Sequence, residues 1–354
     1  MMLVSSHSYF QPLKNALFML FDQHVRRSED IENLLAHILA QQVPTPGWKT
    51  PVRFNLGDRM TQHAVQAPQC PTIPATGDSV AKLLNYLGPR NLITLVVLLL
   101  TDYKIALFGK SFSALAEASR GLAALIYPFT YTGTLIPVLP KNLADYLMSP
   151  VPFLVGVHTD IWESRHCPDV IGCDIDGGKL VIPDNFIVPK LPDLVDKELV
   201  HRLTLVAKPA LVSADLAFPP KKLVQSPGPI LDKEVRAIFL LTLVRVLSNY
   251  RSSLQFSRIH PEVQTKLNRQ EFLQSADPQD FKVKLSCAQS FQVFIQERGP
   301  SFRAIDLFDK MMEDYDEKKI EYDTQSITLE RRVITVRNEF IMNEMPKWND
   351  RVGI

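Results

Sequence analysis

The pattern of apolar and polar positions divides the chain into a helical start, a proline-containing stretch and a longer region of mixed helices and strands. In residues 1–42, apolar side chains recur at helical spacing in two runs, which predicts two helices between residues 9 and 39. Residues 43–79 hold repeated prolines and few periodic apolar positions. They are therefore predicted to form a linker or extended arm that includes a short strand at 52–56.

From residue 80 the pattern strengthens. Residues 80–87 predict a short amphipathic helix, and residues 92–100 are apolar nearly all round, which is typical of a buried helix. A short apolar run at 104–108 predicts a buried strand. A long helix should follow, with Ser111 as its cap and Pro128 at its end. We expect its inward face to hold Phe112, Leu115, Ala116, Leu122, Leu125 and Ile126.

Strands and helices continue to alternate further along the chain. The next predicted elements are a strand, a short helix, a strand and a β-hairpin, at residues 135–139, 142–148, 153–157, and 170–174 with 179–182. Glycines in the Asp176-Gly177-Gly178 turn permit the positive φ that tight hairpin turns demand. This alternation predicts an α/β lobe with a largely parallel sheet over residues 80–192.

Beyond this lobe the chain reads as helical. Residues 193–230 are predicted to be a linker, and residues 231–318 a helical lobe packed on the α/β lobe. Asp232 is a candidate cap for the first helix of that lobe. Further helices are predicted at 263–273, 278–295 and 305–316, and the tail at 319–354 has the apolar spacing of one more amphipathic helix.

Charge and composition then narrow the class of protein. Lys plus Arg number 39 and Asp plus Glu number 38 among 354 residues, so net charge gives no case for nucleic acid as the main ligand. The four cysteines do not suggest a disulfide framework, and His166, Cys167 and Cys173 lack the spacing of a zinc site. Residues 92–100 are too short for a membrane helix, and no secretory signal is visible. We therefore expect a cytoplasmic chain whose membrane contact is indirect.

Motifs of catalysis are missing from their expected places. Gly109-Lys110-Ser111 follows a strand and opens a helix, but Lys104 stands where a phosphate-binding loop needs a glycine. Dinucleotide-binding and hydrolase-nucleophile motifs are also missing from the sequence. The chain therefore reads as a protein-binding scaffold with no cofactor and no metal.

Two rim loops of the predicted sheet carry candidate contact residues. His158 follows the third strand, where α/β sheets present ligand-binding loops, although a lone histidine is more often structural. Asp174 and Asp176 lie on the hairpin and lack the glutamate of a calcium loop. The hairpin is either purely a turn or a loop at the sheet edge that touches a partner.

Several segments together resemble the DENN family. Leu92 to Phe108 resembles the start of its central segment, and residues 135–140 with 147–158 resemble the best fingerprint of that segment. Residues 174–178 resemble the acidic hairpin that follows it. Segments at 214–219, 258–261 and 297–309 resemble the downstream segment, most closely in the SET-binding-factor branch of myotubularin-related proteins. The resemblance spans roughly residues 10–315.

The resemblance implies a Rossmann-like central lobe, a helical downstream lobe and an upstream longin-like lobe. Of this upstream lobe, residues 1–42 look like a helical remnant, with most of the sheet missing. It also implies guanine-nucleotide exchange on a Rab-family small GTPase in membrane trafficking, at vesicle or endosomal membranes, and dimers in the full-length family. Exchange needs no acid–base residue, in keeping with the missing motifs. Loop position suggests the partner-contact residues His158, Asp174, Asp176, Gly177 and Gly178.

Two other functions stay open. A non-catalytic interaction scaffold or regulatory subunit would bind a GTPase whatever its nucleotide state. A small-molecule enzyme would need a deep pocket lined by convergent polar groups at the strand ends.

Overall fold

The structure of the chain is a computed structural model. It describes residues 10–26, 31–40, 52–55, 62–65, 73–184, 186–209, 226–259, 262–274, 280–300, 303 and 305–317. These residues divide into two compact units, one on each side of the bond between Gly77 and Asp78. The tail helix expected at 319–354 lies outside the described residues.

The first unit contains two helices and a β-hairpin. Helix α1 (Phe10–Val25) packs against helix α2 (Ile31–Leu39) through the buried side chains of Leu20 and Leu34. Strand β1 (Val52–Asn55) pairs antiparallel with strand β2 (Gln62–Val65). The two predicted helices and the predicted strand are confirmed, and the segment expected to be a linker with one short strand contains a second strand.

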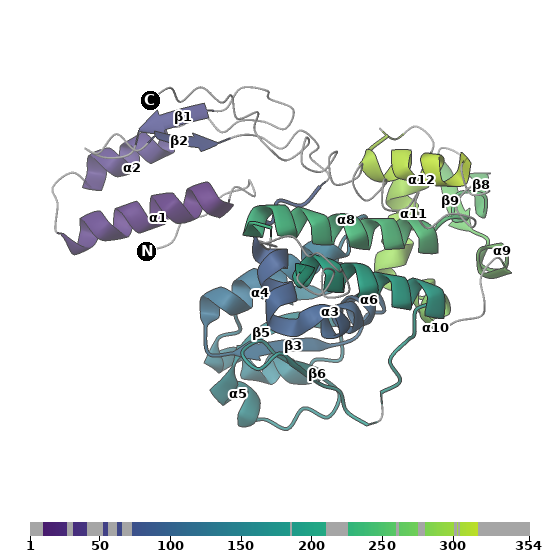
Figure 1. Cartoon of the computed structure of the whole chain (residues 1–354), viewed down its shortest axis with the longest axis horizontal. Helices are drawn as coiled ribbons and strands as arrows, with labels where there is room; N and C mark the ends of the chain where they lie inside the picture. The colour runs from purple at the N-terminus through teal and green to yellow at the C-terminus, as the bar shows by residue number, and fades with distance from the viewer. Residues whose placement is uncertain are drawn as a thin grey trace, which may run out of the picture. The chain divides into compact units, whose positions relative to one another are not determined.

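The second unit is built on a five-stranded sheet in the order β4-β5-β3-β6-β7 (Figure 1). The strands are β3 (Ile105–Gly109), β4 (Thr134–Ile136), β5 (Phe153–His158), β6 (Ile171–Asp174) and β7 (Lys179–Val181). The first four in this order run parallel, and only β7 is antiparallel to its neighbour. The predicted, largely parallel α/β lobe is therefore confirmed.

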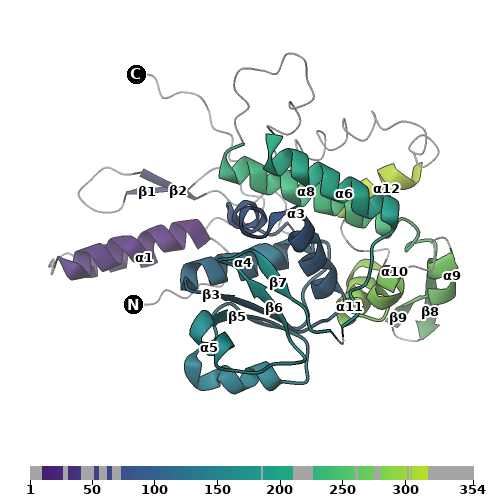
Figure 2. The same ribbon diagram turned by 60° about the horizontal axis from the view of Figure 1, so that its bottom comes forward.

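Helices cover this sheet on both faces. Figure 2 shows α3 (Ser79–Leu100), α4 (Phe112–Leu125), α6 (Asp193–Ala207) and α8 (Gly228–Val246) on one side, and α5 (Thr159–Glu163) on the other. A 3₁₀ helix, η1 (Lys141–Met148), connects β4 to β5. Helix α3 packs against α4, α6 and α8, so it is the centre of the helical layer.

Helix α3 joins the two helices that were predicted separately. Gly88 has a φ of 71° and Pro89 follows it, so the helix bends there. The half after the bend is buried, as expected for a run that is apolar nearly all round. Length and composition of α3 would suit a membrane span, but 61% of its most apolar window is buried inside the fold. That burial is typical of a core helix.

The β6–β7 turn rests on the bend of α3. Gly178 has a φ of 65°, and a Cβ atom there would lie 2.4 Å from the carbonyl oxygen of Tyr86. The Asn91 side chain donates a hydrogen bond of 2.8 Å to the carbonyl oxygen of Gly178. Only glycine combines this backbone conformation with so close an approach, so the bend and the turn fix each other's position.

Two sequence predictions in the downstream region were wrong. The predicted linker at 193–230 contains α6, in which Val195, Leu199 and Leu203 are buried at helical spacing. The predicted helix at 263–273 is instead strand β9 (Glu262–Leu267), paired with β8 (Leu254–Ile259), followed by α9 (Arg269–Gln274). In β9, Val263, Thr265 and Leu267 alternate with polar residues, which is the period of a strand.

The rest of the described downstream region is helical, as predicted, although the single helix predicted at 278–295 is divided into two. It contains α10 (Asp280–Leu285), α11 (Gln289–Arg298) and α12 (Leu307–Glu317). The downstream region is therefore helical with one added hairpin, not all-helical.

An aromatic contact joins this region to the α/β lobe. The Phe129 ring, in the segment after α4, lies 4.8 Å from the Phe294 ring and 6.2 Å from the Phe291 ring, both on α11. The Tyr127 hydroxyl donates a hydrogen bond of 3.2 Å to Asp306. Both predicted lobes therefore belong to one compact unit.

A buried carboxylate fixes the first turn of α3. Asp232 was expected to cap its own helix, but it lies inside α8 and is fully buried. Its Oδ2 accepts the N–H of Val80 at 2.8 Å, and its Oδ1 accepts the Nε–H of Arg236 at 2.9 Å. Asp232 thus satisfies one of the N–H groups that every helix start leaves without an intrahelical acceptor.

We expect Asp232→Ala to lower the free energy of unfolding by about 3–5 kcal/mol, because it leaves the buried Arg236 guanidinium without its carboxylate. Urea denaturation followed by circular dichroism measures the change. Asp196→Ala is the matched control, since Asp196 pairs with the mostly exposed Arg90 and should contribute less than about 1 kcal/mol. Equal losses for the two variants would contradict the role given to Asp232.

Gly178→Ala should destabilise the second unit by roughly 1–3 kcal/mol, because alanine is strained at positive φ and its Cβ would approach Tyr86 too closely. The same denaturation experiment measures it. Gly109→Ala is the control, since a Cβ there makes only ordinary contact with Asp176, 3.5 Å away, and the stability should change by less than about 1 kcal/mol. A tolerated Gly178→Ala would show that the turn does not depend on this approach.

Candidate functional site

Three loops meet at one edge of the central sheet. Strands β3, β5 and β6 are parallel, and their last residues are in register, with Gly109 beside His158 and Phe108 beside Asp174. The loops that follow them therefore lie side by side at the carboxyl ends of the strands. In α/β folds this edge is the usual position of binding sites.

Asp174 serves mainly inside the β6–β7 turn. Its Oδ1 accepts the N–H groups of Asp176 at 3.0 Å and of Gly177 at 2.9 Å. A Cβ on Gly177 would lie 2.4 Å from the other carboxylate oxygen. The side chain thus shapes the turn, in the way that aspartate commonly does.

Asp176 ties this turn to the loop between β3 and α4. Its Oδ2 accepts the Lys110 N–H at 2.9 Å, while the residue itself stays exposed. Ser111, which follows Lys110, caps α4 as predicted, and its side chain accepts the N–H of Ala114 at 3.3 Å. The helix start that a phosphate-binding loop would use is thus occupied by side chains of the protein itself.

His158 ends β5 and caps α5. Its Nδ1 accepts the Asp160 N–H at 3.3 Å and lies 3.5 Å from the Asp160 carboxylate, whose side chain is 86% exposed. The His158 ring contacts the Phe112 ring, with 5.6 Å between the centroids. The histidine therefore has a structural contact and still lies at the surface.

At this edge of the sheet, the sequence analysis placed Phe112 wrongly. It was expected on the inward face of α4, but it is 56% exposed at the start of that helix. The sequence did offer a sign of this exposure, because Phe112 directly follows the cap residue Ser111 and so lies in the first turn of the helix. We define the rim surface as Lys110, Phe112, His158, Asp160 and Asp176.

The structure brings together all five residues that the sequence suggested as contacts, but in different roles. Asp174, Gly177 and Gly178 build the turn, whereas His158 and Asp176 combine internal bonds with surface exposure. Whether any of them touches a partner stays a prediction.

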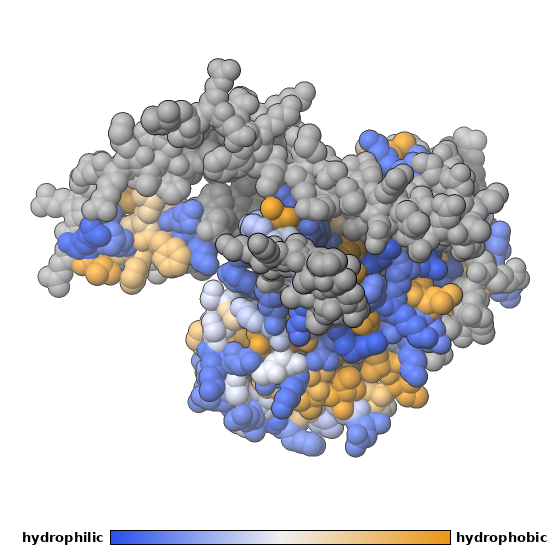
Figure 3. Space-filling model, in the orientation of Figure 1, coloured by the Kyte–Doolittle hydropathy of each residue, from blue (hydrophilic) through white to orange (hydrophobic). Residues whose placement is uncertain are grey.

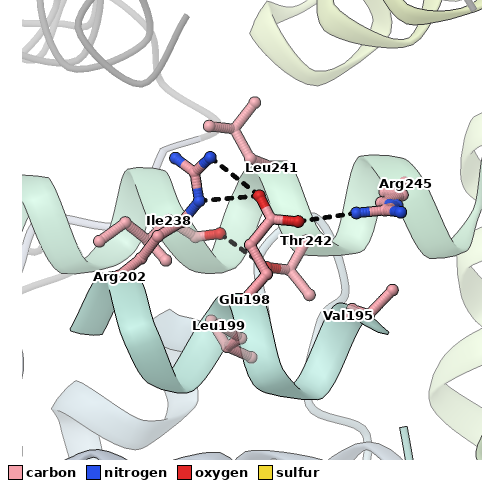
Figure 4. Close-up of a pocket in the computed structure, with 8 residues that line it drawn as sticks. All are labelled: Val195, Glu198, Leu199, Arg202, Ile238, Leu241, Thr242 and Arg245. Atoms are coloured by element: carbon pink, nitrogen blue, oxygen red, sulfur yellow. Dashed lines mark hydrogen bonds and ion pairs between the residues drawn. The ribbon is translucent and has the colours of Figure 1, made fainter. Parts of the chain in front are cut away.

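Two cavities of the described residues lie away from this rim. One, of about 30 Å³, lies between α6 and α8, where Glu198 accepts hydrogen bonds from Arg202 and Arg245 (Figure 4). It has room for about one or two water molecules. The other, of about 270 Å³, lies between β8 and α12. Neither is lined by residues of the strand ends, where an enzyme on this sheet would need its pocket.

Among the described residues, histidine, cysteine, aspartate and glutamate nowhere form a group of three that could hold a metal ion. The Cys173 thiol is buried in β6, and burial raises its pKa far above the usual value. A thiol of this kind is a structural side chain rather than a nucleophile.

The chain is similar to many known proteins, and three of them are described here. Myotubularin-related protein 5 of Caenorhabditis elegans is 30% identical over 248 residues, which are 68% of this chain and 14% of the relative. The DENN domain and WD repeat-containing protein SCD1 of Arabidopsis thaliana is 27% identical over 266 residues, 72% of this chain and 22% of the relative. DENN domain-containing protein 1A of Mus musculus is 25% identical over 292 residues, 81% of this chain and 26% of the relative.

The chain thus spans about a quarter or less of the length of each of these relatives. Their similarity confirms the resemblance to DENN-domain proteins and to a myotubularin-related protein. The model of the DENN (AEX-3) domain family matches residues 1–178, which include the first unit, the four parallel strands and the β6–β7 turn. Because this match covers half of the sequence, the chain belongs to the DENN family.

Proposed function

We propose that the chain binds a Rab-family small GTPase and promotes release of its nucleotide, with the rim surface forming part of the contact. The observation that carries this proposal is the family match over residues 1–178, which includes every residue of the rim surface. The expected activity needs no catalytic side chain. An exchange factor acts by binding the nucleotide-free GTPase more tightly than the loaded one, so that nucleotide and exchanger weaken each other's binding.

The rim surface has a composition suited to a protein contact. A half-exposed aromatic ring, Phe112, lies against His158 and is flanked by the charged side chains of Lys110, Asp160 and Asp176. Aromatic anchors inside a polar margin contribute most of the binding energy in many interfaces. The face of the second unit seen in Figure 3 also combines a hydrophilic area around α6 with a patch of apolar side chains below it. Contiguous apolar surface of this kind supports a protein partner.

The proposed setting is the cytoplasmic side of vesicle or endosomal membranes, where the GTPase would hold the chain at the surface. A dimer, as the resemblance implies, is part of the same proposal. A scaffold without exchange activity is the alternative, and it differs in one measurable respect: its affinity would not depend on the nucleotide state of the GTPase.

Release of a fluorescent GDP analogue from a panel of Rab GTPases tests the function. The full chain should accelerate release from at least one Rab, and it should bind that Rab more tightly without nucleotide than with GDP. Equal affinity for the two states without acceleration would establish the scaffold. If the chain neither binds any Rab nor accelerates nucleotide release from one, both the exchange function and the scaffold function are overturned.

The rim surface is tested by Phe112→Ala. We expect the exchange rate at limiting chain concentration to fall about tenfold or more, because a central aromatic side chain of an interface typically contributes about 2 kcal/mol or more. The unfolding free energy should stay nearly constant, since the ring is 56% exposed. Phe256→Ala is the matched control: Phe256 is also 56% exposed but lies on β8, so its loss should leave exchange unchanged. Equal effects of the two variants would place the contact elsewhere.

A further inference from the structure

The cavity between β8 and α12 is lined by both charged and apolar side chains. Its volume is about 270 Å³, and the charged residues that line it are three arginines, Arg251, Arg298 and Arg303, with Asp309 and Glu313. Figures 1 and 2 place this part of the second unit on the opposite side from α5 and the rim surface. The cavity is therefore separate from the site described above.

Two buried carboxylates hold the arginines in place. Asp309 is fully buried, and its Oδ1 accepts a hydrogen bond of 2.8 Å from Arg251, while its Oδ2 accepts one from Arg303. Behind it, Asp306 accepts two bonds from Arg298, at 3.0 and 2.8 Å. Burial alone would raise the pKa of Asp306, but the Arg298 guanidinium outweighs it and lowers the pKa to about 2. Both carboxylates are thus bound within the protein and orient the guanidinium groups, and of the two only Asp309 lines the cavity.

The same carboxylates fix the start of α12. Asp306 donates its N–H to Asp309 at 3.1 Å, and Asp309 donates its N–H to Asp306 at 3.2 Å. This reciprocal pair is a capping box with aspartate in both positions. The arginines are therefore held against a rigid helix end.

The two buried carboxylates carry one charge fewer than the three arginines that they bind. Arg251, Arg298 and Arg303 carry three positive charges, and Asp306 and Asp309 carry two negative ones. The remaining charge is balanced by Glu313, whose Oε1 accepts a bond of 3.2 Å from Arg251. Glu313 is 51% exposed and Arg251 is 35% exposed, so this pair contributes little and is easily exchanged. Glu313 is thus positioned as an internal substitute for a carboxylate from outside.

Apolar side chains flank these groups. Phe256 on β8 is 56% exposed and Ile305 before α12 is 61% exposed, and both line the cavity. A ligand that fits must therefore combine one negative charge with an apolar group. A carboxylate suits Arg251 because its Nη1, which now donates to Glu313, can form a charge-assisted hydrogen bond, while Nε and Nη2 donate to Tyr250 and Asp309.

We propose that this cavity binds a short segment of a partner protein in which a glutamate or aspartate stands beside an apolar residue. The ligand carboxylate takes the place of Glu313 on Arg251, and the apolar side chain packs on Phe256 and Ile305. A single negative charge from the ligand replaces that of Glu313, whereas a multiply charged phosphate would add negative charge beside Asp309, which also lines the cavity. The proposal does not depend on the activity toward a GTPase.

Fluorescence anisotropy with the full chain tests this proposal. The probes are short fluorescein-labelled peptides of glycine and serine with a central glutamate flanked by leucine, phenylalanine or valine, and each has a counterpart with glutamine. At least one glutamate peptide should bind about tenfold more tightly than its glutamine counterpart, the size expected for a charge-assisted hydrogen bond. Equal binding within every pair, or no binding by any peptide, overturns the proposal.

Variants locate the binding site. Glu313→Gln removes the competing carboxylate without leaving a buried charge unpaired. The affinity for the glutamate peptide should therefore rise several-fold. Arg251→Gln should weaken binding of the glutamate peptide about tenfold. Its melting temperature is measured as well, because Asp309 loses one of its partners in this variant. Arg90→Gln is the control, since Arg90 is 61% exposed in an ion pair with Asp196 and should bind as the parent chain does.

An unchanged affinity in Glu313→Gln overturns the proposal even if Arg251→Gln unfolds. Vesicles of phosphatidylcholine with phosphatidylserine provide a further comparison. Binding to such vesicles that depends on Arg251, without binding of any peptide, would assign the cavity to a membrane surface and also overturn it.

Discussion

The position of α3 depends on one buried carboxylate supplied from far along the chain. Asp232 on α8 binds the N–H of Val80, which lies 152 residues earlier, and also pairs with the buried Arg236. An uncompensated charge in this environment would be costly, so the three groups specify one arrangement of α3 against α8. Helix α3 in turn packs on α4 and α6, and its bend receives the β6–β7 turn through Asn91 and Gly178. The rim of the sheet is therefore positioned by a contact made in the downstream region.

Most of the central lobe could be predicted because its signals are local. The strands at Ile105–Gly109 and Phe153–His158 are continuous apolar runs, and the helix between Ser111 and Pro128 has both a cap and a stop. The predictions that failed concern segments whose structure depends on contacts with other parts of the chain. In 262–267, alternation of Val263, Thr265 and Leu267 competes with a helical reading, and pairing with β8 decides between them. Helix α6 was missed because prolines before it suggested a linker, although Pro192 simply precedes its first residue.

In the candidate site too, the features set by local sequence could be predicted and those set by the folded backbone could not. The sequence correctly placed His158 and the Asp176 turn at strand ends, because parallel strands bring their carboxyl ends to one edge. It could not show that Asp174 binds N–H groups of its own turn or that Asp176 accepts the Lys110 N–H, since those bonds depend on the folded backbone. Nor could helical periodicity show that Phe112 lies in an exposed part of the first turn of α4, before the buried Leu115. Exposure of a residue on a periodic apolar face is a property of where the helix begins relative to the sheet.

The aromatic contact between the segment after α4 and α11 has a consequence for how this family is divided into fragments. The stretch recognised by the family model stops at residue 178, yet Phe129 within it is only 5% exposed and packs on Phe291 and Phe294. A protein cut at that recognition limit would present an unsheltered phenylalanine and a bare face of α3 to solvent, and such surfaces promote aggregation. The limit of sequence recognition is thus not a limit of cooperative folding, and a soluble fragment has to keep the helices that follow.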